Sequence, residues 1–157
     1  MRKQILKGVT MLMLVVAVAF MTAVASANAQ SRTVNAKVPF EFMVGDKALP
    51  AGEYSIRSMT AGAEALAIRN EDSDKTAIRL SNTVTRSNAP EKTTLLFHRY
   101  GQQYFLFQVW HGGETTGRQL IKSKQERAIE SQLAAIPSKS DLARSNYELV
   151  EIVAMVR

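Results

Sequence analysis

The aromatic segment from Leu95 to Trp110 constrains the fold of this chain more than any other stretch. It consists of two apolar runs separated by the short segment 100–103, which contains Gly101. Two apolar runs joined by a short loop with a glycine are typical of a β-hairpin, because glycine adopts the backbone angles that a tight reversal requires. We therefore expect this hairpin to form the centre of the core.

The second run of the hairpin is apolar on both of its faces. Strict alternation places on one face Tyr104, Leu106, Gln108 and Trp110. It places on the opposite face Phe105, Phe107, Val109 and His111. A strand without a polar face is typical of a central position, so we expect this strand to be covered on both sides.

Alternating apolar residues predict further strands before and after the hairpin. Residues 34–43 alternate strictly. Because Pro39 has no N–H to donate, this segment predicts an edge strand or a strand with a bulge. Shorter alternating stretches follow before the hairpin, and a last one covers residues 147–156. The expected fold class is mainly β, an antiparallel sandwich or flattened barrel of six to seven strands.

One amphipathic helix is expected after the hairpin. The segment from Gly112 to Gly117 is polar and predicts a flexible connection. Ser123 and Glu126 then have the spacing of a capping box. The apolar residues that follow have helical spacing as far as residue 136, and Pro137 ends the pattern. We expect a helix over residues 123–136 on the outside of the sheet, because its apolar stripe is narrow.

The first residues predict export. Arg2, Lys3 and Lys7 precede a long apolar run, and small residues near Ala27 and Ala29 form two overlapping cleavage sites. This order is typical of a secretory signal peptide over residues 1–29, with cleavage near Ala27 or Ala29. The alternative is an uncleaved membrane anchor. With cleavage, residues 30–157 form a single β-rich domain in the periplasm or outside the cell, without a membrane span.

The composition offers little for catalysis or metal binding. The chain has no Cys, so it has neither disulfides nor thiolate metal ligands. Its two histidines, His98 and His111, are too few for a typical zinc site. The sequence also lacks the Gly-x-Ser-x-Gly pattern of a nucleophile elbow. We therefore predict no catalytic residues, no metal, no cofactor and no enzymatic activity.

Cationic and aromatic side chains occur together near the hairpin turn and the glycine-containing connection. The speculative ligand-binding set is Arg99, Tyr100, Tyr104, Trp110, His111 and Arg118. Such groups can bind single-stranded nucleic acid or acidic glycans. The whole-chain charge of +6 includes three cations of the predicted signal, and a small remaining excess favours a solvated charged face instead. No nucleic acid partner is expected.

Three functional hypotheses follow. The first is an exported, non-catalytic binding or interaction module of unknown ligand, whose partner is an envelope protein, a glycan or an apolar small molecule. The second is a small lipocalin-like carrier of an apolar ligand, with Phe105, Phe107 and Trp110 lining its cavity. The third is a hydrolase-type enzyme, which requires a carboxylate or serine within hydrogen-bond reach of His98 or His111. Self-association through a bare edge strand is a further expectation.

Several segments resemble a group of small exported proteins from soil bacteria of the acidobacterial type. Residues 38–54 read VPFEFMVGDKALPAGEY, and residues 97–101 read FHRYG. The pattern continues with GRQL at 117–120 and KSKQER at 122–127. The resemblance covers roughly residues 38–127. It implies export and implies no particular activity.

Overall fold

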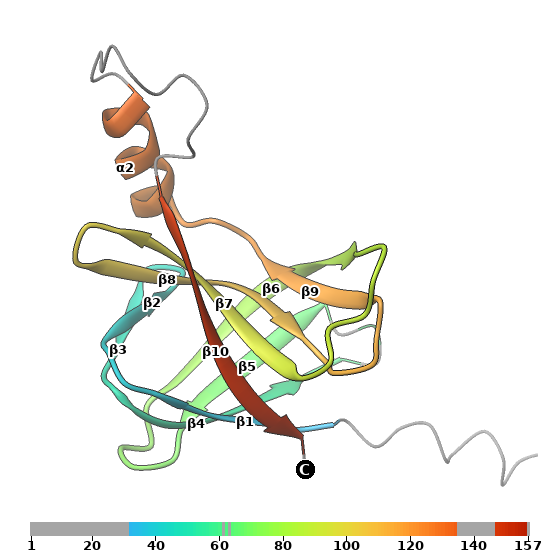
Figure 1. The fold of residues 1–157 in the computed structure, drawn as a ribbon. Helices are drawn as coiled ribbons and strands as arrows, with labels where there is room; N and C mark the ends of the chain where they lie inside the picture. Colours follow the sequence, from blue (N-terminus) through green and yellow to red (C-terminus); the bar gives the residue numbers. More distant parts are fainter. Residues whose placement is uncertain (1–31, 61, 63, 135–146, 157) are drawn as a thin grey trace, which may run out of the picture. The chain divides into compact units, whose positions relative to one another are not determined.

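The computed structural model describes residues 32–60, 62, 64–134 and 147–156, which belong to one compact unit that starts at Arg32 (Figure 1). The first strands are β1 (Val34–Val38), β2 (Phe42–Val44), β3 (Lys47–Leu49), β4 (Gly52–Ser58) and β5 (Ala65–Asn70). They are followed by β6 (Thr76–Thr85), β7 (Thr93–Tyr100), β8 (Gln103–Trp110) and β9 (Thr116–Leu120). Helix α2 (Lys124–Ala134) and strand β10 (Glu148–Val156) come last. The expected signal peptide lies outside the described residues.

The strands form a closed antiparallel barrel with two additional strands. Eight strands follow one another in the order β8-β7-β10-β1-β4-β5-β6-β9, and pairing between β9 and β8 closes the ring. The short strands β2 and β3 extend from β8, and the contact between β2 and β8 is the one parallel pairing among the described strands. The mainly β prediction is confirmed, whereas a sandwich of six to seven strands is wrong.

Two predicted features differ from this topology. The segment predicted as a loop ends in strand β9, because Thr116 and Gly117 pair with β6 and Gly117 also pairs with β8. The first strand, β1, is not an edge: it pairs with β10 on one side and β4 on the other. Pro39 lies just after β1, where the missing N–H does not interrupt a ladder. Self-association through a bare β1 edge therefore has no structural basis.

Alternating residues of the ring point into one apolar core. β1 contributes Val34, Ala36 and Val38, and β4 contributes Tyr54 and Ile56, all buried. Phe42 packs edge-to-face against Tyr54 and Phe97, with ring centroids 4.9 and 5.3 Å apart. Aromatic rings prefer such arrangements, which place the positive edge of one ring on the negative face of another.

The aromatic hairpin forms as expected, and Gly101 occupies its turn with a φ of 62°. The register, however, shifts between Leu96 and Phe97, which leaves Phe107 as the extra residue of a bulge in β8. The bulge reverses the alternation that the sequence predicts. Leu106 and Val109 both belong to the interior cluster, whereas Trp110 packs outside it.

Helix α2 begins immediately after Ser123, whose Oγ accepts a hydrogen bond from the Glu126 N–H at 3.0 Å. This contact is one half of the predicted capping box. The Glu126 carboxylate bonds instead to His98 on β7, and Glu126 is the buried residue of the helix. The helix lies outside the barrel strands (Figure 1), and predicted residues 135 and 136 lie outside the described part of the chain. None of the described helical residues forms a helix long and apolar enough to span a membrane.

Candidate functional site

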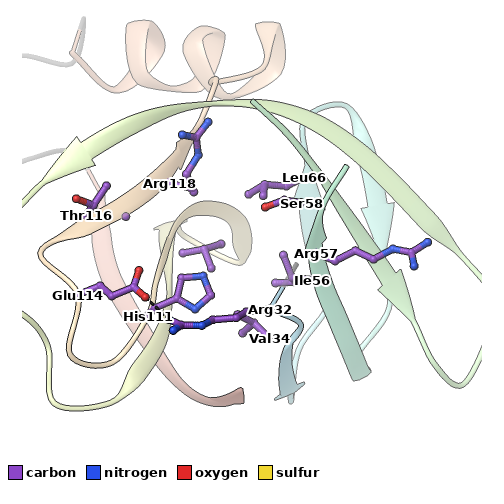
Figure 2. Close-up of a pocket in the computed structure, with 12 residues that line it drawn as sticks. Arg32, Val34, Ile56, Arg57, Ser58, Leu66, His111, Glu114, Thr116 and Arg118 are labelled. Carbon is purple, nitrogen blue, oxygen red and sulfur yellow. Dashed lines mark hydrogen bonds and ion pairs between the residues drawn. The ribbon is translucent and has the colours of Figure 1, made fainter. Parts of the chain in front are cut away.

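A cavity of about 230 Å³ opens at one end of the barrel, and we call it the mouth pocket (Figure 2). The start of β1, the end of β4, the start of β5, the end of β8 and the start of β9 meet there. Its lining residues are Arg32, Val34, Ile56, Arg57, Ser58, Leu66, Val109, His111, Glu114, Thr116, Gly117 and Arg118. The pocket is enclosed on this side because Val109 of β8 pairs with Arg118 of β9, which joins two of the strands that line it.

The inner wall of the mouth pocket is apolar. Val34, Ile56, Leu66 and Val109 are each at most 3% exposed, and all four belong to the interior cluster. Alternation along β1, β4 and β5 turns these side chains inward, as the period of a strand requires. The pocket therefore continues the hydrophobic core towards the open end of the barrel.

His111 is the polar group that distinguishes the mouth pocket. Its Nδ1 is buried and has no hydrogen-bond partner among the described residues. Burial is the main cause that lowers the pKa of His111 below its ordinary value. The charge of Glu114 raises the pKa and the charge of Arg32 lowers it. The imidazole is therefore neutral at pH 7. A buried polar atom without a partner is rare in native proteins, and one that lines a cavity can be satisfied by a water, an ion or a ligand there.

Two arginines of the pocket have partners of their own. Arg32 forms an exposed ion pair with Glu114, next to His111 (Figure 2). The Arg118 guanidinium is directed away from His111, towards β6. There it donates to the Ser81 carbonyl oxygen at 2.9 Å and to the Thr83 hydroxyl at 2.6 Å. Burial lowers the pKa of Arg118, but not enough to remove its charge.

A second polar cluster lies between β7 and helix α2. His98 is 0% exposed, and its Nδ1 lies 2.8 Å from the Glu126 carboxylate. The Tyr100 hydroxyl donates to Glu130 at 2.8 Å, and Lys122 forms an ion pair with Glu130. Desolvation and the neighbouring carboxylates raise the pKa of Tyr100 well above its ordinary value. This network attaches the helix to the outer face of the barrel.

The contact between His98 and Glu126 places a carboxylate within hydrogen-bond reach of a histidine, which is the geometry that the enzyme hypothesis requires. The imidazole is, however, enclosed by aromatic rings: Phe107 stacks on it with ring centroids 3.8 Å apart, and Tyr147 lies tilted against it with centroids 3.9 Å apart. His98 does not line the mouth pocket. Among the described residues, no group of three His, Asp or Glu side chains is arranged to hold a metal ion.

The structure distributes the predicted ligand-binding residues over several places. His111 and Arg118 come together in the mouth pocket. Arg99 and Tyr104 contact each other near the hairpin turn, with the guanidinium 5.5 Å from the ring centre. Tyr100 belongs to the cluster under α2.

Trp110 is 2% exposed and packs against Gly117, with the Arg86 guanidinium 4.0 Å from its ring centre. It is therefore closed to a ligand.

The residues proposed for a carrier cavity do not line the mouth pocket. Phe105 packs edge-to-face on Tyr100, and Phe107 stacks on His98, both outside the interior cluster. Arg32, Glu114 and the apolar wall of the pocket are not predicted as site residues from the sequence. Alternation could have supplied Val34 and Ile56 as inward residues, but no sequence signal indicates which end of the barrel stays open.

Comparisons with known proteins add no further information, since no family model, curated protein or solved structure matches the chain. The functional assignment therefore rests on the geometry of the mouth pocket and of the cluster under α2.

Proposed function

We propose that this protein is an exported, non-catalytic binding module that holds a small molecule in the mouth pocket. The observation that supports this proposal best is the pocket itself: an apolar interior wall next to a buried His111 Nδ1 that has no partner in the described part of the chain. Binding sites for small molecules are typically concave and apolar, with a few polar groups that fix orientation. The volume of about 230 Å³ is below the range of about 300–1,000 Å³ typical of drug-sized ligands, so the ligand is small.

A binding role is preferred to catalysis because of the burial of His98. A general base must reach the proton that it abstracts, and His98 is 0% exposed under Phe107 and Tyr147. The network around it is better explained as the attachment of helix α2. Among the described residues, His111 Nδ1 has no hydrogen-bond partner, so neither a carboxylate nor a serine activates the ring through this atom.

A blocking substitution tests the proposal. Thr116 is exposed and lines the pocket, so Thr116→Trp places a large ring in the opening without replacing a core residue. Leu80→Trp is the matched control, because Leu80 is 60% exposed on β6 and does not line the pocket. Saturation-transfer NMR against a mixture of small fragments should detect binding to the wild type and to Leu80→Trp. Binding should be lost in Thr116→Trp. Equal binding to all three proteins would refute the mouth pocket as the site.

A further inference from the structure

We infer that the ligand of the mouth pocket is a small apolar carboxylate, whose chain lies on the interior wall and whose carboxylate meets His111. This inference rests on the proposed function and narrows it to one chemical class. It draws on the volume of the pocket, on the unpartnered His111 atom and on the charges of the lining.

The volume limits the length of the ligand. The cavity of about 230 Å³ lies below the range of about 300–1,000 Å³ that is typical of drug-sized ligands, so a short-chain molecule such as hexanoate is a suitable size. Each methylene of the chain that meets the apolar wall should strengthen binding roughly fourfold.

His111 selects a polar group on the ligand. A neutral imidazole carries one N–H donor and one acceptor nitrogen, and which nitrogen carries the proton follows the partner that is present. A ligand carboxylate accepts from Nδ1–H and supplies the hydrogen bond that the buried atom lacks. A hydrogen bond to a charged acceptor is stronger than one to a neutral acceptor, which favours a carboxylate over a hydroxyl.

The charges of the lining residues also favour an anionic ligand. Three arginines and one carboxylate line the pocket, and His111 is neutral. Glu114 is already paired with Arg32, which leaves the positive charges of Arg57 and Arg118 without an acidic counterpart in the lining. Arg118 donates to β6 and Arg57 is directed away from the other lining residues, so both act on a ligand only at long range, and the excess of three arginines over one carboxylate in the lining favours an anion over an amine.

Methyl NMR of the purified protein at pH 7 tests this inference with three ligands of equal length: hexanoate, hexanol and hexylamine. Hexanoate should shift the methyl signals of Ile56, Leu66 and Val109. The methyls of Ile78 and Leu80, which are 61% and 60% exposed on β6, are the internal control and should not move. Hexanol should bind at least tenfold more weakly, and hexylamine should not bind.

Two variants separate the contributions of the hydrogen bond and of the charge. His111→Phe retains a ring of similar size and should weaken hexanoate binding at least fivefold, while hexanol binding stays within twofold. Arg57 is exposed and directed away from the other lining residues, so Arg57→Gln should leave the fold intact (Figure 2). It should weaken hexanoate binding about twofold, with no effect on hexanol.

The outcomes distinguish the two proposals. If hexanol shifts the pocket methyls as strongly as hexanoate does, the site stands and the carboxylate assignment is wrong. If none of the three ligands moves these methyls while the fragment mixture still binds to the wild type and not to Thr116→Trp, the ligand class is again wrong. If nothing binds in either experiment, both proposals are wrong.

Discussion

The pairing of β8 with β9, which closes the barrel, depends on Gly117. Replacing this residue by alanine should therefore destabilise the fold. A Cβ at position 117 would lie 2.6 Å from two carbon atoms of the Trp110 ring, whereas ordinary contacts begin at 3.4 Å. Either the ring or the strand must therefore move by about 0.8 Å. Trp110 is 2% exposed, and β9 is fixed by pairing with both β6 and β8, so neither moves freely.

The expected loss is the cost of overpacking minus a gain from the unfolded chain. Overpacking a dense region costs about 1–3 kcal/mol. Replacing glycine by alanine reduces the entropy of the unfolded chain and returns about 0.4–1 kcal/mol. We therefore expect Gly117→Ala to lower the free energy of unfolding by about 1–2 kcal/mol, with a Tm decrease of roughly 3–10 °C.

Urea unfolding followed by circular dichroism provides the measurement. Gly62→Ala is the control, because a Cβ at Gly62 meets atoms no closer than 3.6 Å. It should be neutral or slightly stabilising. In a Trp110→Leu background, Gly117→Ala should cost at least about 1 kcal/mol less than in the wild type, because the clashing ring is absent. An equal cost in both backgrounds would refute the clash as the cause.

The network under α2 allows two more predictions. Glu126→Ala leaves the buried His98 Nδ1 without its acceptor and should lower the free energy of unfolding by about 1–3 kcal/mol. The control Glu148→Ala removes an exposed ion pair and should lower it by less than about 1 kcal/mol. Similar losses for both variants in urea unfolding would contradict the role of the buried contact. Burial raises the pKa of Glu130, but hydrogen bonds from Lys122 and Tyr100 outweigh burial and hold the pKa below its ordinary value of 4.5. A carboxyl with a lowered pKa stabilises the fold above its unfolded pKa and loses this contribution as the pH falls through the folded pKa. The stability difference between wild type and Lys122→Met should therefore be larger at pH 7 than at pH 3, and an equal difference at both pH values would contradict this assignment.

Much of the barrel wall follows from local sequence patterns. Residues of β1 alternate strictly, and the hairpin turn at Gly101 is marked by a glycine between two apolar runs, so a strand at β1 and the hairpin are predicted correctly. The strand predicted over residues 34–43 is too long, because this segment divides into β1, which ends at Val38, and β2, which begins at Phe42. Strand β9 was missed because its threonine and glycine residues are equally typical of loops. Gly117 is needed there for the close approach of Trp110, which is a tertiary contact that a local pattern does not contain.

The site was less accessible to sequence reasoning, and the bulge in β8 is the main reason. The extra residue Phe107 exchanges the inward and outward faces for the residues of β8 that follow it. Val109 therefore faces the interior, and Trp110 packs outside it. A bulge has no strong sequence signal, because it is set by the pairing of two strands. Likewise, Ser123 and Glu126 predict the start of a helix, but only the tertiary structure brings Glu126 to His98.

The central claim is that the open end of the barrel holds a ligand, and native mass spectrometry of the protein isolated from its own cells tests it most directly. We predict that wild type and Leu80→Trp carry one additional small molecule of fixed mass, and that Thr116→Trp carries none. A bound molecule that persists in Thr116→Trp would place the binding site elsewhere. The bare protein mass for wild type, under conditions that preserve noncovalent complexes, would contradict the claim.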